Sequence, residues 1–292
     1  MKPSPSVPSR DFAASLEIVT EPIVRAALLE DIGRGGDLTT EALVEPSREA
    51  TAQIVARSSG VIAGVSVAVL AFRLLEERIN AAILIGDGER VEAGGVVAEI
   101  AGSARAILTA ERSALNFLSH LSGIATATRA LVDLVAGTRA KIADTRKTTP
   151  GLRALERYAV ACGGGTNHRF GLDDGVLIKD NHLALAGSIR AAVAAARARA
   201  GHMVKVEVEV DTLEQLEEAL AEPVDAVLLD NMDPAMLAEA VRVVDGRVLV
   251  EASGGVNESN VLAIARAGVD VISVGRLTHS APSLDLSLEV SS

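Results

Sequence analysis

The sequence predicts an α/β protein in two parts: a small N-terminal α/β domain, then a barrel or partial barrel of parallel strands. Between residues 50 and 108, short β-type runs alternate with glycine turns around one helical stretch. From residue 140 onward, strand-like runs alternate with helical stretches about every 20–35 residues, the pattern of βα units. Several of these strands are apolar throughout, as strands buried on both faces are. Six units in succession favour a barrel over a doubly wound sheet.

In the N-terminal half, local signals predict several boundaries. Residues 1–10 are rich in Pro and Ser and predict a disordered tail without the apolar region of a signal peptide. Residues 17–30 have helical spacing, and Pro22 predicts a helix start nearby. The Asp87-Gly88 pair between apolar runs predicts a hairpin. Residues 104–108 are read as a strand.

A long helix is predicted to follow from Thr109, with an interruption at Gly123. Arg112 falls near its expected N-terminus, where a positive charge opposes the helix dipole, so we expect a partner for it. That partner is either a ligand or a surface acid, Glu111 or Asp133. His120, on an apolar helix face, is interpreted as structural.

In the second half of the chain, residues typical of helix caps stand between the predicted strands. Thr149-Pro150, Asp211 with Glu214, and Asp233-Pro234 predict three helix starts. The six predicted strands are 140–144, 175–179, 204–210, 226–230, 247–251 and 269–274.

Composition excludes several classes of protein. The net charge of −11 and the 2% of aromatic residues disfavour a nucleic-acid binder. No apolar run reaches the ~20 residues that cross a bilayer, which predicts a soluble protein with no membrane partner. The single cysteine, Cys162, excludes internal disulfides and fits a reducing cytoplasm. We expect Cys162 to be a small packed residue, with a nucleophile as the alternative.

A cationic island lies within this acidic chain. The segment 139–182 has eight Lys and Arg against five Asp and Glu, and two of the five lysines of the chain, Lys147 and Lys179, lie in its TRK and IKD motifs. Such an island predicts a pocket for an anion. Three glycines, 163–165, precede His168 and Arg169, and their N–H groups are expected to converge on that anion. A flexible loop with solvated charges is the alternative.

The ends of the predicted strands indicate where the site lies. In (β/α) barrels the active site is built at the carboxyl ends of several strands, and charged or small residues stand there in this sequence. They are Asp144-Thr145-Arg146-Lys147, Lys179-Asp180-Asn181, Glu209, Asp230-Asn231, Ser253-Gly254-Gly255 and Gly275-Arg276. The last two groups are typical of a phosphate-binding cup. Because side chains alternate along a strand, Glu207 and Glu209 point to the same side.

Long stretches around these strand ends resemble the quinolinate phosphoribosyltransferase family. They are IADTRKTTPGLRALERYAVACGGGTNHRFGLDDGVLIKDNH, VEVEVDTLEQLEEAL, VLLDNM, EASGGV and SVGRLTHSAPSLDLSL. DIGRGGDLTT and ERSALNFLSHLSGIAT extend the likeness into the N-terminal half. The likeness therefore covers nearly everything after the tail.

This resemblance implies an α/β sandwich over residues 11–115 and an open α/β barrel, of the type II phosphoribosyltransferase kind, over 116–282. Residues 283–292 would pack back on the sandwich. It implies a homodimer with shared active sites that uses Mg²⁺. The implied reaction joins quinolinate and phosphoribosyl pyrophosphate (PRPP) to give nicotinate mononucleotide, pyrophosphate and CO2, a step of NAD biosynthesis.

The resemblance also implies residue roles. The residues that hold the quinolinate carboxylates are Arg146, His168, Arg169 and Lys179, with Thr145 beside them and Arg112 reaching the site of the partner subunit. Lys147 faces the pyrophosphate. Glu209 and Asp230 face the ribose hydroxyls and Mg²⁺, directly or indirectly. The cradle of the 5′-phosphate is Ser253, Gly254, Gly255, Val274, Gly275 and Arg276. The residues with an implied catalytic role are Lys147, Lys179, Glu209 and Asp230.

The chemistry of these residue types agrees with the resemblance. Forked guanidinium groups suit planar carboxylates, and carboxylates supply the hard oxygen ligands that Mg²⁺ prefers. Two alternatives stay open. One is a Schiff-base lyase with Lys147 or Lys179 as nucleophile. The other is a related barrel that acts on a different ring acid, or that binds a phosphoribosyl group without turnover.

Overall fold

The structure is a computed structural model that describes residues 10–291, with side chains from Ile18 onward. The predicted tail lies outside the described residues except for Arg10, which begins the first helix. Contacts divide the chain into two compact units. The first takes in residues up to 129 with 148–164 and the segment from 277, and the second takes in 130–147 and 165–276. The predicted domain limits, 11–115 and 116–282, stay predictions.

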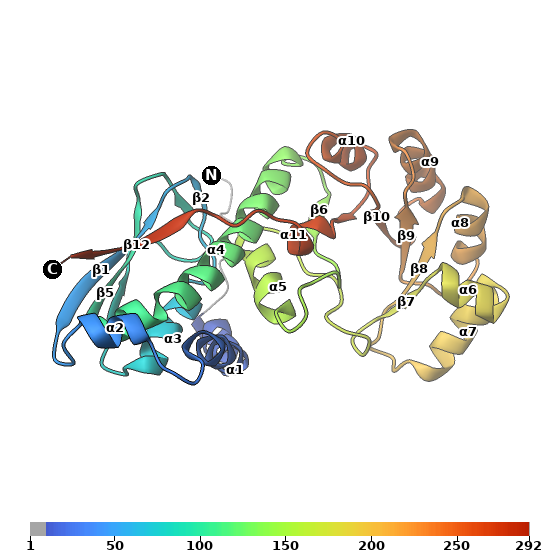
Figure 1. The fold of residues 1–292 in the computed structure, drawn as a ribbon. Coiled ribbons are helices and arrows are strands. Elements are labelled where there is room, and N and C mark those ends of the chain that lie inside the picture. The colour runs from blue at the N-terminus through green and yellow to red at the C-terminus, as the bar shows by residue number, and fades with distance from the viewer. Residues whose placement is uncertain (1–9, 292) are drawn as a thin grey trace. The chain divides into compact units, whose positions relative to one another are not determined.

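The first unit contains a four-stranded antiparallel sheet in the order β12-β1-β5-β3 (Figure 1). Its strands are β1 (Glu49–Ala56), β3 (Asn80–Ile83), β5 (Val96–Ser103) and β12 (Leu286–Ser291). Every second residue in the latter half of β1, from Ala52 to Ala56, is buried, which gives the strand one apolar face. The last strand of the chain pairs with β1, so that Leu288 lies opposite Ile54.

The hairpin expected at Asp87-Gly88 was wrong. The strands on either side, β3 and β4 (Arg90–Val91), pair with different partners: β3 with β5, and β4 with β2 (Gly60–Val61). Asp87 has another use, because its carboxylate accepts the backbone N–H of Val65 and the hydroxyl of Tyr158. A DG pair marks a turn, and here tertiary pairing decides which strands it joins.

Helices complete the first unit, and two starts differ from those predicted. The helices are α1 (Arg10–Ile32), α2 (Leu38–Leu43), α3 (Val65–Leu75), α4 (Ala104–Leu134), α5 (Arg153–Cys162) and α11 (Arg276–His279), with α4 and α11 crossing the limits of the unit. Pro22 lies inside α1, because the Ala, Leu and Glu residues before it are strong helix formers. Residues 104–108, read as a strand, are helical.

The helix α4 is not interrupted at Gly123. A Cβ atom at this position would stand 2.1 Å from the carbonyl oxygen of Pro282. The glycine is therefore a point of close backbone approach and not a break in the helix.

The second unit is built on the predicted parallel sheet. The strands are β6 (Lys141–Ala143), β7 (Val176–Ile178), β8 (Val206–Val210), β9 (Ala226–Asp230), β10 (Leu249–Ser253) and β11 (Val271–Ser273). Their order, β6-β11-β10-β9-β8-β7, puts β6 and β7 at opposite edges, so the barrel is open between them. A single parallel bridge from Thr166 to Ala143 places the chain before β7 beside β6. The prediction of a parallel, open barrel is confirmed.

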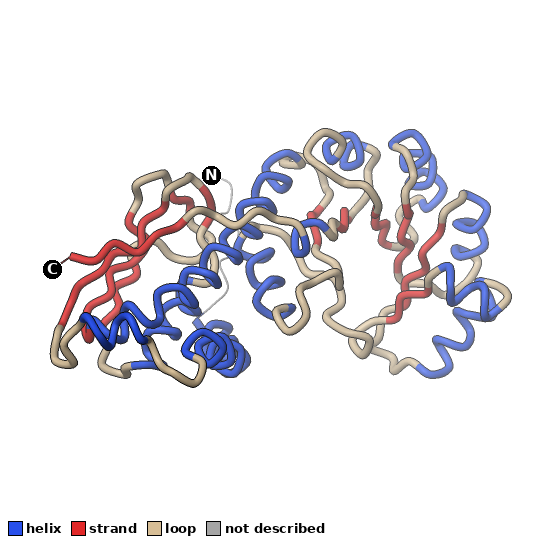
Figure 2. Tube along the Cα trace, viewed as in Figure 1, coloured by secondary structure: helices blue, strands red, loops and turns tan. Residues whose placement is uncertain are grey.

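Helices cover the outer side of this sheet (Figure 2). They are α6 (Asp180–Ala186), α7 (Ile189–Arg199), α8 (Leu213–Leu220), α9 (Pro234–Val244) and α10 (Val261–Arg266). Asp233 caps α9 as predicted, by accepting the N–H groups of Ala235 and Met236. The cap of α8 is Thr212 and not Asp211, and α5 begins three residues after Pro150. No helix among the described residues is long and apolar enough to cross a membrane.

Candidate functional site

The predicted site residues of the second unit gather at one edge of the parallel sheet. Carboxyl ends of parallel strands meet at the same edge. Arg146 follows β6, Lys179 follows β7, and Glu209 and Asp230 lie at the ends of the neighbouring strands β8 and β9. The remaining predicted residues at this edge are Thr145, Lys147, Ser253, Gly254, Gly255, Val274, Gly275 and Arg276. The bridge at Thr166 brings the segment of His168 and Arg169 beside β6.

The imidazole of His168 lies between two buried glutamates. Its Nε2 atom is 3.3 Å from Oε2 of Glu207 and 3.4 Å from Oε2 of Glu251. Its Nδ1 atom accepts a 2.8 Å hydrogen bond from the backbone N–H of Arg169. The backbone N–H of His168 donates to Oδ1 of the buried Asp144, also at 2.8 Å. Both ring nitrogens of His168 are thus engaged within the protein.

The surroundings of this cluster raise the pKa values of His168 and Glu207. Burial by itself lowers the pKa of His168, but the hydrogen bonds and charges of Glu207 and Glu251 outweigh it and raise this pKa to about 10. Burial, followed by the charge of Glu251, raises the pKa of Glu207. The protonation of His168 and that of Glu207 therefore depend on each other.

Two guanidinium groups stand close together at the same edge. Burial, and then the positive charge of the nearby Arg146, lowers the pKa of Arg169. Nη1 of Arg169 donates to the carbonyl oxygen of Gly175 at 2.8 Å, which fixes the direction of the side chain. Positive charge is therefore concentrated on oriented groups.

The remaining charged residues form short polar contacts. Nζ of Lys179 is 2.8 Å from Oε2 of Glu209, so both residues at the ends of β7 and β8 point to the same place. Oδ2 of Asp230 accepts from the Asn231 amide at 2.6 Å, and Arg276 pairs with Glu258 at 2.8 Å. Both cationic and acidic groups therefore lie along this edge.

The strand end at Ser253 has the backbone of a tight cup. Gly254 has φ +97°, and a Cβ atom there would stand 2.1 Å from Oδ1 of Asn231. Only glycine fits both conditions. One predicted part of the phosphate cradle is already used, since the N–H of Val274 donates to the carbonyl oxygen of Ala143.

The glycine run 163–165 does not have the expected role. The N–H groups of Gly163 and Gly164 donate to Ala159 and Ala161, where they close the end of α5. A Cβ atom at Gly163 would stand 2.6 Å from Thr128, so this position serves close helix packing. Cys162 is buried and burial raises its pKa to about 12, in agreement with the packed residue and not with a nucleophile.

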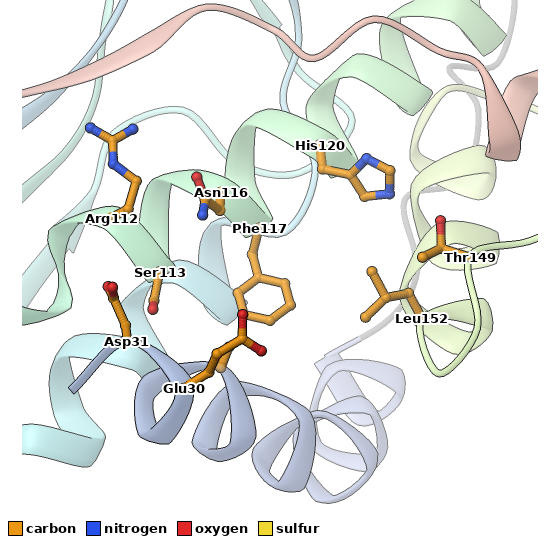
Figure 3. A pocket seen from close by; sticks show the side chains of 10 residues that line it. Glu30, Asp31, Arg112, Ser113, Asn116, Phe117, His120, Thr149 and Leu152 are labelled. Carbon is orange, nitrogen blue, oxygen red and sulfur yellow. The ribbon is translucent and has the colours of Figure 1, made fainter. Parts of the chain in front are cut away.

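Arg112 belongs to the first unit and lines a cavity of about 450 Å³ there. It lies well inside α4, not at the helix N-terminus, because α4 begins at Ala104. Figure 3 shows Arg112 at one end of the cavity and His120, Thr149 and Leu152 at the other. The side chain of Arg112 is 65% exposed, and its Nη2 is 3.9 Å from Glu111, so its guanidinium is accessible.

Sequence reasoning missed three acidic residues around His168. Asp144 and Glu251 were not singled out as ligands of the histidine, although Asp144 directly follows β6 and Glu251 lies within β10. Glu207 had a visible signal, because it alternates with Glu209 in VEVEV and therefore shares its face. Pairing across the open edge of the barrel, which no local pattern encodes, brought them to His168.

The sequence matches the models of one known protein family over most of its length. The family model described as the C-terminal domain of quinolinate phosphoribosyl transferase matches residues 124–289, and the model of its N-terminal domain matches 37–122. The chain belongs to the quinolinate phosphoribosyltransferase family. The family predicted from the sequence is confirmed.

Individual members of the family agree over nearly the whole chain. The carboxylating nicotinate-nucleotide pyrophosphorylase of Mycobacterium leprae is 48% identical over 272 residues, which cover 91% of this chain and 95% of that protein. The nicotinate-nucleotide pyrophosphorylase structure from Francisella tularensis superposes with a TM-score of 0.90 at 39% identity, over 100% of both chains. NadC from Streptococcus pyogenes has a TM-score of 0.91 at 42% identity, over 94% of this chain and 97% of that one.

Proposed function

We propose that this chain is a decarboxylating quinolinate phosphoribosyltransferase, a pentosyltransferase of NAD biosynthesis, and that its site is the carboxyl edge of the parallel sheet. It transfers the phosphoribosyl group of PRPP to quinolinate and yields nicotinate mononucleotide, pyrophosphate and CO2. This is the activity that the sequence predicted, and relatives at 48% identity are named for it.

The observation that carries the assignment to this edge is the proximity of Arg146 and Arg169. Two buried or half-buried guanidinium groups repel each other, and the charge of Arg146 contributes to lowering the pKa of Arg169. A ligand with two adjacent carboxylates relieves that repulsion and matches the forked donors. Lys179, at the neighbouring strand end, supplies a further cation to a dianionic ligand.

The charged residues at this edge would assist each step of the proposed reaction. Departure of pyrophosphate from C1′ builds positive charge on the ribose, which the carboxylates of Glu209 and Asp230 are placed to stabilise. The cations hold the ring so that its nitrogen attacks C1′ in line. Once this nitrogen carries four bonds, its positive charge stabilises the electron pair that stays on the adjacent ring carbon when the neighbouring carboxylate leaves as CO2, and a proton from water then forms the C–H bond of the product. No protein side chain needs to form a covalent intermediate.

Mg²⁺ is part of the proposal. Glu209 and Asp230 end adjacent strands and offer carboxylate oxygens, and a site with one or two carboxylates plus phosphate oxygens suits this ion. The two carboxylates are therefore suitable ligands for Mg²⁺. When bound, Mg²⁺ would neutralise charge on the departing pyrophosphate.

A homodimer completes the proposal. Arg112 has an accessible guanidinium, and among the residues that the structure describes its one acidic partner is Glu111 at 3.9 Å. We assign it to the site of a second copy, where it would add a cation for a quinolinate carboxylate.

A cytoplasmic location is also proposed. It rests on the single thiol of Cys162, which is buried and forms no disulfide. Cell fractionation with an antibody to the chain tests it, and recovery outside the cytoplasm contradicts it.

The Schiff-base alternative finds less support. The ammonium of Lys179 is bound to Glu209, whereas an attacking amine must be uncharged. Borohydride added during turnover would trap an imine on a lysine of the lyase. The proposed transferase gives no such adduct.

Turnover assays with PRPP, Mg²⁺ and either quinolinate or nicotinate test the function. Matched amounts of mononucleotide and CO2 from quinolinate are expected. Product from nicotinate alone would contradict the dicarboxylate site and indicate a relative that does not decarboxylate. Absence of product from both acids would contradict the transferase itself.

A further inference from the structure

Lys179 is the single residue between β7, which ends at Ile178, and α6, which begins at Asp180. Its backbone is extended, with φ −115° and ψ 169°, so its conformation still follows the strand. Its Nζ is 2.8 Å from Oε2 of Glu209, and its side chain is 46% exposed. Because no loop separates the strand from the helix, the direction of the Lys179 side chain depends on where the helix begins.

The beginning of α6 lacks the side chain that commonly caps a helix. A serine, threonine, aspartate or asparagine before a helix accepts N–H groups of the first turn, but the side chain of Lys179 has no acceptor atom. No residue of α6, from Asp180 to Ala186, is buried, so packing adds little to its stability. Local hydrogen bonds therefore define the first turn.

His182, the third residue of α6, makes two of these hydrogen bonds. The backbone N–H of Lys179 donates to Nδ1 of His182 at 2.9 Å, and the backbone N–H of His182 donates to the carbonyl oxygen of Lys179 at 2.8 Å. A side chain at the third helical position that reaches back to the residue before the helix is one half of a capping box, for which glutamate and glutamine are the common residues. Here a histidine has this function.

We propose that His182 is a positioning residue for Lys179. It holds the backbone of Lys179 through Nδ1 and so directs the ammonium group to the place where it meets Glu209 and a carboxylate of the substrate. His182 itself needs no contact with the substrate. The role of Lys179 in binding quinolinate rests on the proposed function.

Chemical labelling tests the position of Lys179 without any substrate. Acetic anhydride acetylates each lysine at a rate that depends on its exposure and its ion pairs, and peptide mass spectrometry measures each rate separately. Lys205, whose Nζ is 2.8 Å from Oδ1 of Asp225, serves as the internal reference. In His182→Ala we expect the rate at Lys179 relative to Lys205 to rise about fivefold, the effect of one lost hydrogen bond. An unchanged ratio would overturn the proposal.

Two variants separate loss of the acceptor from disturbance of the helix. Alanine favours a helix more than histidine does, so His182→Ala removes the acceptor without weakening α6 through its propensity. His182→Gln retains an acceptor that can reach back to the residue before the helix. We expect His182→Ala to weaken quinolinate binding, measured by calorimetry, about fivefold, and His182→Gln and the exposed control His202→Ala to bind as tightly as wild type. Equal losses in His182→Ala and His182→Gln would contradict the role of the acceptor.

A double variant tests whether His182 acts through Lys179. In that case, adding His182→Ala to Lys179→Ala causes no further loss of quinolinate binding, because the group that His182 directs is already absent. A further fivefold loss would indicate direct contact between His182 and the ligand and would contradict the proposal. Wild type that binds no quinolinate refutes the proposed function, and the labelling ratio then tests the position of Lys179 by itself.

Discussion

Two histidines of this chain contact buried glutamates, one histidine in each unit, and their surroundings differ. Nε2 of His120, in α4, is 2.8 Å from Oε1 of Glu156, and Oε2 of Glu156 accepts the N–H of Thr149 at 3.0 Å. Both oxygens of this fully buried carboxylate are thus used. His168 lies between two glutamates, and one oxygen of Glu251 stays without a partner among the described residues.

The difference separates a structural pair from a site. Glu156 joins α4, α5 and the loop before α5 with every polar atom satisfied, which stabilises the fold. Around His168, carboxylates lie close to carboxylates and guanidinium groups close to guanidinium groups. This arrangement costs free energy, which a purely structural role does not explain. A cluster of like charges therefore indicates a ligand site better than a contact between a histidine and a glutamate does.

The largest expected effect that tests this difference is at Arg146. Arg146→Ala should lower kcat/KM for quinolinate about a hundredfold or more, because it removes a charged partner of the dianion. Steady-state assays measure this, with the exposed Arg190→Ala on α7 as control. Equal losses in both variants would contradict a site at the carboxyl edge.

The structural role of the contact between His120 and Glu156 is tested by a substitution of Glu156. Glu156→Leu leaves His120 and the Thr149 N–H without their acceptor and should destabilise the protein by about 2 kcal/mol. Urea unfolding followed by circular dichroism measures it, with Glu156→Gln, which keeps an acceptor, expected to lose less. A large rise in the KM for quinolinate without loss of stability would place His120 among the substrate contacts.

Mixing two inactive variants tests the proposal that Arg112 acts in the site of a second subunit. Subunits with Arg112→Ala, refolded with an equal amount of Arg146→Ala subunits, form mixed dimers in which one site has both arginines. Activity should recover to about a quarter of wild type if the site is shared between subunits. No recovery, despite mixed dimers on native mass spectrometry, would show that Arg112 acts within its own chain or not at all.

The smallest effect concerns Asp225, a carboxylate outside the His168 cluster. Burial alone would raise the pKa of Asp225, but Lys205, the Val206 N–H and Arg197 lower it from 3.8 to about 2. A lowered acid pKa stabilises the folded state above its unfolded value, and this contribution is lost as pH falls from about 4 through 2. Solvent screening limits it to about 1 kcal/mol.

Asp225→Asn should therefore unfold more easily than wild type at neutral pH, and the difference should shrink below pH 4. Urea midpoints measured between pH 7 and pH 2 test this. A gap between the two proteins that widens on acidification would contradict the assigned contacts.

Much of the fold followed from local patterns. All six parallel strands lie where the sequence predicted them, and several of them are the continuous apolar runs that strands buried on both faces form. The Asp233-Pro234 cap was also read correctly, since a cap involves only neighbouring residues. The predictions that were wrong concern residues that contact parts of the chain far away in sequence. Gly123 was read as a break but faces Pro282, and Asp87 was read as a hairpin residue but binds Tyr158.

For the site, the sequence by itself determined which residues stand at the strand ends and which family they resemble, because both are properties of residue order. The tertiary structure decided what touches His168. Glu207 lies in β8, Glu251 in β10, and Asp144 directly after β6, and they meet His168 because the barrel stays open between β6 and β7 and the segment at Thr166 pairs with β6. Contacts between residues so far apart in the chain depend on sheet order.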